Sequence, residues 1–272
     1  MPDTHHLFSS PENFRRFLAA CGIRNVERGI ANFDAIRSLG WSDREVSRFI
    51  LVLAKALPKV ADPDQALNNI DRLVSTSPSV SQKIRTLSSL ATPFEGLLTL
   101  LSDSQYLADL LRDESNLDEI IRARFQPVAR QLLIGGAIEF VKTAKDFSEA
   151  MRRLRVFKQR ETIRIAWCDL VLDHRVEQVT EQISSLAASV CEAALHWCRA
   201  RLEEKFGPPF SAAAERCRFV ILGLGKLGGN ELNYSSDIDL IAVYEFEGKV
   251  KSNAINSNRC LLYTSPSPRD RG

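Results

Sequence analysis

The sequence predicts an α+β protein in which a long helical region is followed by the beginning of an α/β domain. From about residue 11 to 206, apolar residues recur every three or four positions and glycine is sparse. After Pro209, short β-branched apolar runs and a glycine-rich stretch replace that pattern. We therefore expect a helical region over residues 1–209 and a partial α/β domain over 210–258.

The clearest helix start in the first half lies at Ser42. Glu45 follows three residues later, which is the pattern of a capping box. Pro58 ends this helix, and shorter helices are expected after it over 64–75, 79–90, 94–102 and 104–112. The apolar face of the Ser42 helix consists of Val46, Phe49, Ile50, Leu53 and Leu57.

Two longer helices are expected over 146–173 and 175–206, and Gly207-Pro208-Pro209 ends the second. Their apolar stripes predict core packing along both helices. The stripe residues are Phe147, Met151, Leu154, Phe157, Trp167 and Leu170 in the first helix, and Val176, Val179, Ile183, Leu186, Val190, Ala194 and Trp197 in the second.

The first long helix also carries a run of basic residues. Such a run is typical of a solvated face, here with Glu161 as an ion-pair partner one turn away. Clustered arginines also bind anions, so an acidic partner or a phosphate is the alternative. The run consists of Arg152, Arg153, Arg155, Lys158, Arg160 and Arg164.

Composition excludes several classes of function. The net charge is only +2 with 26% charged residues, whereas a dedicated nucleic-acid-binding protein usually has a strong basic excess. The 6 cysteines form no C-x-x-C pair and no zinc-ligand cluster, so we expect reduced, buried thiols. No run approaches the roughly 18 apolar residues of a membrane span, and Met1–Ser10 lacks the apolar stretch of a signal peptide. These features predict a cytoplasmic protein without nucleic-acid or membrane partners.

The residues that indicate chemistry lie between two expected buried strands, 218–224 and 237–244. Gly223, Gly225 and Gly228 spell the dinucleotide-binding pattern G-x-G-x-x-G. That fold needs a parallel crossover of at least about ten to twelve residues. Only seven residues separate Gly229 from Asp237, so the length excludes it. A P-loop is excluded as well, because no Ser or Thr follows Lys226.

A metal-dependent phosphoryl-transfer site fits the same segment. Asp237 and Asp239 share one face of a strand, and Ile238 and Leu240 would then face the core. Paired carboxylates repel unless a cation lies between them, and hard oxygen ligands suit Mg²⁺. Glycines allow backbone N–H groups to approach phosphate oxygens, with Lys226 as a nearby positive charge. The plainer alternative is a tight turn followed by a solvent-facing strand start.

The stretch from Gly223 to Ile241, GLGKLGGNELNYSSDIDLI, resembles the motif of the bifunctional glutamine synthetase adenylyltransferase/adenylyl-removing (glutamate–ammonia-ligase adenylyltransferase) family, which belongs to the nucleotidyltransferase superfamily. The family carries this motif twice, and the sequence of the motif in this chain resembles the first copy. Segments 104–111 and 160–170 are also similar to the amino-terminal half, so the resemblance covers roughly residues 10–258.

The resemblance implies a nucleotidyltransferase-type domain with a mixed sheet, truncated in this chain. It implies an enzyme of nitrogen metabolism whose amino-terminal half removes AMP from adenylylated glutamine synthetase by phosphorolysis, giving ADP, and whose other half attaches AMP from ATP. Glutamine as effector and a PII-type signal protein would regulate it. By position, Asp237 and Asp239 would be catalytic and hold Mg²⁺, and Ser236 would contact phosphate. The glycines of the phosphate-binding turn would be Gly225, Gly228 and Gly229, while the role of Lys226 in neutralising phosphate is argued from its charge alone.

The end of the chain departs from the family pattern. A third carboxylate is expected from a later strand, and Glu245 and Glu247 follow Asp239 too closely to supply it. Residues 259–272 resemble a translated sequencing adapter and are expected to be a non-native tail. We therefore expect a partial or inactive site, and a 218–247 segment that is poorly stable or aggregation-prone. The alternatives are a non-catalytic helical adaptor with a degenerate nucleotide pocket, or a nucleotidyltransferase with another acceptor.

Overall fold

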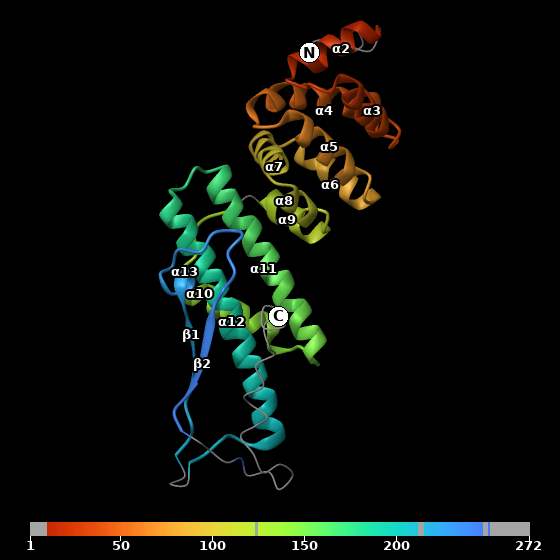
Figure 1. Ribbon diagram of the computed structural model, residues 1–272. Helices are drawn as coiled ribbons and strands as arrows, with labels where there is room; N and C mark the ends of the chain where they lie inside the picture. The colour runs from red at the N-terminus through yellow and green to blue at the C-terminus, as the bar shows by residue number, and fades with distance from the viewer. Residues whose placement is uncertain (1–9, 123–124, 212–214, 247–249, 251–272) are drawn as a thin grey trace, which may run out of the picture. The chain divides into compact units, whose positions relative to one another are not determined.

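The computed structural model describes residues 10–122, 125–211, 215–246 and 250 (Figure 1). The chain forms two compact units, and both are discontinuous in sequence. Unit 1 comprises Met1–Pro127 and Gln159–Val179, and unit 2 comprises Val128–Lys158 and Thr180–Gly272. The expected domain boundaries at 209/210 and 258/259 stay predictions. Glu247 and the expected non-native tail lie outside the described residues.

Unit 1 is built from helices, as the apolar periodicity predicts. The Ser42 helix and the shorter helices expected after it are confirmed to within a few residues. Two helices that were not predicted individually precede them, and another follows. The helices are α2 (Pro11–Ala20), α3 (Val26–Arg37), α4 (Asp43–Ala56), α5 (Pro63–Val74), α6 (Pro78–Leu87), α7 (Ala91–Asp103), α8 (Gln105–Leu110) and α9 (Glu114–Arg122), with a 3₁₀ turn, η1 (Leu57–Lys59), after α4.

Glu45 supports the start of α4 as expected. Its carboxylate accepts hydrogen bonds from the Ser42 backbone N–H at 2.9 Å and from the Ser42 hydroxyl at 2.7 Å. These bonds, followed by the smaller effect of Arg85, lower the pKa of Glu45. The carboxylate therefore stays ionised at the positive end of the helix, where a negative charge stabilises it.

Polar contacts link helices of unit 1 at similar distances along the chain. The Trp41 indole donates to Ser81 Oγ at 3.0 Å, across 40 residues. Asn32 donates to Asn68 Oδ1 at 2.7 Å, across 36 residues, and the Arg24 N–H donates to Asp64 Oδ2 at 2.9 Å, again across 40. Such recurrence is typical of stacked helix pairs, and Figure 1 shows α2 to α9 layered in this way.

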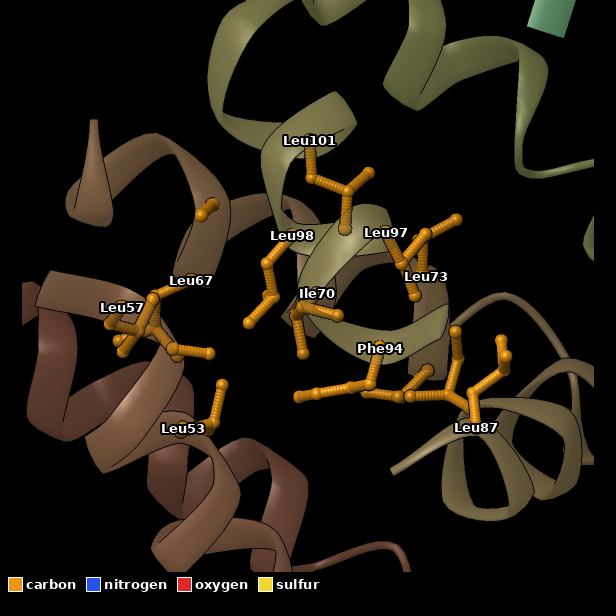
Figure 2. Close-up of a cluster of buried hydrophobic side chains, with 14 of the residues drawn as sticks. Leu53, Leu57, Leu67, Ile70, Leu73, Leu87, Phe94, Leu97, Leu98 and Leu101 are labelled. Atoms are coloured by element: carbon orange, nitrogen blue, oxygen red, sulfur yellow. The ribbon is translucent and has the colours of Figure 1, made fainter. Parts of the chain in front are cut away.

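The core of unit 1 lies between α4, α5, α6 and α7 (Figure 2). Phe94 of α7 contacts Phe49 of α4 edge-on, with ring centroids 5.7 Å apart. The second half of α11 (Phe147–Leu170) also belongs to this core, through Ile163, Ala166 and Trp167. The other residues labelled in Figure 2 are Leu53, Leu57, Leu67, Ile70, Leu73, Leu87, Leu97, Leu98 and Leu101.

Unit 2 combines helices with a β-hairpin. Its helices are α10 (Arg130–Lys142), the first half of α11, and α12 (Val176–Phe206) from Thr180 onward. The C-terminal end of α12 is followed by Gly207 with φ 77°, whose N–H donates to the Glu203 carbonyl at 2.8 Å, so the predicted glycine stop is confirmed. The core residues of this unit are Ala137, Val141, Ala144, Ala150, Leu154, Ala193 and Trp197.

The two long helices are confirmed, but their predicted stripes are only partly buried. Phe147 is 62% exposed and Val176 is 67% exposed, and Met151 and Leu170 are exposed as well. The prediction that these four residues pack in the core is therefore wrong. All four lie at or near a helix end. A periodic stripe predicts which face is apolar, but not how far a neighbouring element covers it.

The basic run on α11 is divided between structural and exposed side chains. Arg153 pairs with Glu149 at 2.7 Å. Arg164 is only 7% exposed and pairs with Glu161 at 2.6 Å, as expected, while it donates to the Gln126 carbonyl at 2.9 Å. These two arginines stabilise the fold. An anionic partner would have to meet the exposed members, Arg152, Arg155 and Lys158, and stays a prediction.

The cysteines are free thiols in the part of the chain that the structure describes. Cys21, Cys168 and Cys217 are buried as predicted, whereas Cys191 and Cys198 are only half-buried; Cys260 lies outside the described residues. Burial raises the pKa of the Cys21 thiol to about 11. In the described ranges, no helix is long and apolar enough to cross a membrane.

Candidate functional site

The hairpin places the glycine-rich turn and the paired carboxylates at the same end. Strand β1 (Phe219–Gly223) pairs antiparallel with β2 (Leu240–Tyr244), from Phe219 opposite Tyr244 to Gly223 opposite Leu240. The Leu224 N–H donates to the Asp239 carbonyl at 2.9 Å, which extends the pairing by one step. Asp239 therefore lies opposite Leu224, the residue before Gly225.

Antiparallel pairing confirms that the glycines do not form a dinucleotide-binding βαβ unit, which needs parallel strands. The α+β class is confirmed too. Among the described residues the sheet contains only these two strands, so the nucleotidyltransferase-type mixed sheet stays a prediction.

The glycine-rich segment forms one short helical turn, α13 (Gly225–Gly228). Gly225 has φ 52°, a left-handed conformation that glycine adopts without steric cost. A Cβ on Gly228 would lie 2.7 Å from the Gly223 carbonyl oxygen, so only glycine fits there. Leu227 is buried against Gly223 and closes the turn over β1.

The turn uses some of its backbone donors and leaves others available. The Gly228 N–H donates to the Leu224 carbonyl at 3.2 Å, and the Gly229 N–H donates to the Gly225 carbonyl at 3.0 Å. The N–H groups of Gly225, Lys226 and Leu227 make no hydrogen bond to any described residue. An anion would therefore meet the first amides of the turn, while Gly228 and Gly229 shape it.

The two carboxylates lie just before β2, in a segment without regular secondary structure. Asp237 and Asp239 are two residues apart and both are exposed, but they precede β2, so their placement on one strand face stays a prediction. Ile238 and Leu240 are 40% and 42% exposed, so the prediction that they face the core is wrong. The prediction of two buried strands is wrong for the same reason. A sheet face is buried only when a second layer covers it, and the described residues leave much of this hairpin uncovered.

Asn233 organises the turn that precedes Asp237. Its side-chain oxygen accepts from the Ser235 N–H at 3.1 Å and from the Ser236 hydroxyl at 2.9 Å. The Asn233 N–H in turn donates to Ser236 Oγ at 3.2 Å. Sequence reasoning missed this role, although Asn before a short polar run is a known turn former. Ser236 would have to exchange these bonds to contact a phosphate, so that role stays a prediction.

The donor set fits a divalent cation only in part. Asp237 and Asp239 offer the oxygen ligands that Mg²⁺ prefers. No group of three or more His, Cys, Asp or Glu side chains that could hold a metal ion occurs among the residues described. Lys226 is exposed on the same turn and makes no ion pair within the described ranges.

Glu245 does not supply the third carboxylate. It lies at the opposite end of β2, where the Arg218 guanidinium donates to it at 2.6 Å and 3.0 Å and holds its pKa below the ordinary value. The six residue steps from Asp239 to Glu245, along β2, correspond to roughly 20 Å. The expectation that Glu245 marks a strand end is confirmed.

Known proteins similar to this chain belong to the family that the glycine- and aspartate-containing motif resembles. The family described as Glutamate-ammonia ligase adenylyltransferase matches residues 94–262. A bifunctional glutamine synthetase adenylyltransferase/adenylyl-removing enzyme of Thioalkalivibrio sulfidiphilus is 40% identical over 109 residues, which are 40% of this chain and 11% of that protein. A protein of the same description from Hahella chejuensis is 32% identical over 182 residues, 66% of this chain and 19% of the relative. The matched stretch thus spans less than a fifth of either relative's length. Because the family match covers more than half of its residues, the chain belongs to the glutamate-ammonia ligase adenylyltransferase family.

Proposed function

We propose that this chain supplies the nucleotide- and metal-binding end of a site that removes AMP from adenylylated glutamine synthetase by phosphorolysis. One observation carries the proposal: the hairpin joins a turn with available amides directly to the paired carboxylates. The sequence of the motif around Asp237 resembles the amino-terminal copy in the family, which supports removal rather than attachment of AMP.

Each residue at this end of the hairpin has a distinct task in the proposal. The Gly225 and Lys226 amides hydrogen-bond phosphate oxygens, and the Lys226 ammonium offsets their charge. Asp237 and Asp239 hold Mg²⁺, with the third carboxylate coming from outside the described residues. When bound, Mg²⁺ would polarise a phosphoryl oxygen and stabilise the developing charge.

The proposed partners follow from the family and from the names of the relatives. Both relatives are described as acting in adenylylation and adenylyl removal on glutamine synthetase. We propose adenylylated glutamine synthetase as substrate, inorganic phosphate as co-substrate and ADP as product. Attachment of AMP from ATP, and regulation by glutamine and a PII-type protein, are proposed for the longer enzyme.

The first test is Mg²⁺-dependent binding of ADP to this chain, measured by isothermal titration calorimetry with Mg²⁺ or with EDTA. We expect binding to require Mg²⁺, and Asp237→Asn to weaken it at least about tenfold because the charged oxygen ligand is lost. The matched control is Asp173→Asn, an exposed residue with φ 53°, a conformation that Asn also adopts.

Binding that is absent, or indifferent to Mg²⁺ and to Asp237→Asn, would favour the helical adaptor. In the longer protein that carries this stretch, the same substitution should abolish phosphate-dependent release of ADP from adenylylated glutamine synthetase. Full release by the Asp237→Asn variant would contradict the proposed function.

A further inference from the structure

We propose that Ser184, a buried serine of α12, is a positioning residue that holds the carboxylate segment in place for Mg²⁺-dependent nucleotide binding. This inference rests on the proposed function. Ser184 is distant in sequence from the motif, and nothing in its own surroundings along the chain marks it as functional.

The Ser184 hydroxyl links α12 to the loop between α13 and β2, at Leu232. It donates to the Thr180 carbonyl of its own helix at 2.8 Å, and it accepts from the Leu232 N–H at 3.0 Å, across 48 residues. Ser184 is 0% exposed and Leu232 is 2% exposed, so no water is at hand to replace the hydroxyl. A buried N–H without an acceptor is unfavourable, and the loop would have to move to satisfy it.

The bond fixes one end of the segment that carries the carboxylates. Leu232 immediately precedes the hydrogen-bonded Asn233–Ser236 turn. At the other end, the Asp239 carbonyl is held by the Leu224 N–H of the opposite strand. Asp237 lies between these two attachments. Its position relative to the glycine-rich turn therefore depends on the contact between Ser184 and Leu232.

The glycine-rich turn is tied to the same attachment point. The Glu231 N–H, one residue before Leu232, donates to the Lys226 carbonyl at 2.8 Å. Loss of the Ser184 bond would therefore loosen the turn and the carboxylate segment together, and would disturb the match between phosphate donors and metal ligands.

Ser189 provides a matched comparison on the same helix. It is also 0% exposed, and its hydroxyl donates to the Ser185 carbonyl at 2.6 Å, inside α12. Ser189→Ala removes a buried serine hydroxyl and its helix bond without touching the loop. Ser184→Ala removes the same kind of helix bond and also the acceptor of Leu232. The difference between the two variants isolates the contact with the loop.

The test applies two measurements to the unmodified chain, Ser184→Ala and Ser189→Ala. The first is ADP affinity by calorimetry at several Mg²⁺ concentrations. The second is backbone hydrogen exchange of peptides covering 230–240. For Ser184→Ala we expect faster exchange and an affinity for ADP with Mg²⁺ about tenfold or more weaker, the range typical when a supporting hydrogen bond of a metal site is removed. Ser189→Ala should match the unmodified chain in both.

Equal behaviour of the two variants would overturn the proposal. Faster exchange with unchanged affinity would also overturn it, because Ser184 would then stabilise the loop without positioning the site. If the unmodified chain binds no ADP, the proposed function fails. The positioning role of Ser184 then fails with it, whereas ADP binding that Ser184→Ala leaves unchanged overturns the positioning role alone.

Discussion

Glu203, near the end of α12, joins two parts of unit 2. Its carboxylate accepts from Arg199, one turn earlier on α12, at 2.7 Å and from Arg216, just before β1, at 2.6 Å and 2.7 Å. Burial opposes ionisation of Glu203, but the hydrogen bonds from both arginines outweigh it and lower its pKa. The carboxylate thus stabilises the attachment of the hairpin to the helix.

We expect Glu203→Gln to lower the free energy of unfolding of unit 2 by about 1 kcal/mol at neutral pH, the usual range for losing a partly exposed charged hydrogen bond. Because the folded pKa is depressed, this stabilisation is present above the unfolded pKa and disappears as pH falls through the folded value. The control is Glu204→Gln, whose carboxylate is 72% exposed and pairs with Arg201 at 3.2 Å. Thermal unfolding at pH 7 and at about pH 2, where glutamate is protonated even with a lowered pKa, should show a difference between the variants only at pH 7; an equal loss at both would contradict the expectation.

The sequence predicted which residue types would form the candidate site, and their roles in binding stay predictions. The glycines and aspartates around Asp237 were recognisable by pattern. The pattern did not separate Gly228, which must avoid the Gly223 carbonyl, from Gly225, which needs a positive φ. Asn233 and Ser184 were missed, because their roles depend on a turn geometry and on a contact across 48 residues.

The sequence predicted where the helices lie, but it did not predict which helices pack against each other. The apolar period located α7 and α11, but it did not indicate that Trp167 of α11 lies over Gly96 of α7. A Cβ on Gly96 would lie 2.2 Å from that indole ring. Such a contact depends on the tertiary arrangement of segments about seventy residues apart, which local periodicity does not encode.

Two glycine-to-alanine changes in helices should act in opposite directions. Gly96→Ala should destabilise unit 1 by about 1–3 kcal/mol, because the new methyl group overlaps the buried Trp167 ring. Gly135→Ala in α10 should stabilise unit 2 by about 0.5–1 kcal/mol, because nothing lies within 4 Å and alanine restricts the unfolded chain. Urea unfolding followed by circular dichroism and tryptophan fluorescence measures both. If both variants change the free energy of unfolding in the same direction, this account of Gly96 is refuted.

The hairpin leaves one apolar face exposed over both strands. Val220 and Leu222 of β1 lie opposite Val243 and Ile241 of β2. Each of the four is 40% to 50% exposed. Contiguous apolar surface and unpaired strand edges favour association between molecules. The sequence-based expectation of an aggregation-prone 218–247 segment has this face as its physical basis.

Charging the centre of that face should reduce self-association of the chain. The double substitution Leu222→Lys with Ile241→Glu places opposite charges on a directly paired position, so strand pairing is kept while the apolar face is interrupted. Val176→Lys serves as the control, since Val176 is exposed at the start of a helix and belongs to unit 1, whereas the hairpin belongs to unit 2. Sedimentation velocity over a range of protein concentrations should show less association for the double variant alone. Equal association of all three proteins would mean that this face does not drive it.

The discontinuity of the two units affects how the chain can be made and divided. The backbone passes between them after Pro127, Lys158 and Val179, and α11 contributes to both. A gene fragment that stops at residue 127 would encode α2 to α9 without Ile163, Ala166 and Trp167, which complete their core. During synthesis, unit 1 likewise stays incomplete on the ribosome until α11 has emerged. A single cut therefore cannot yield two intact halves, and a fragment that is to contain all of unit 1 has to extend at least to residue 179.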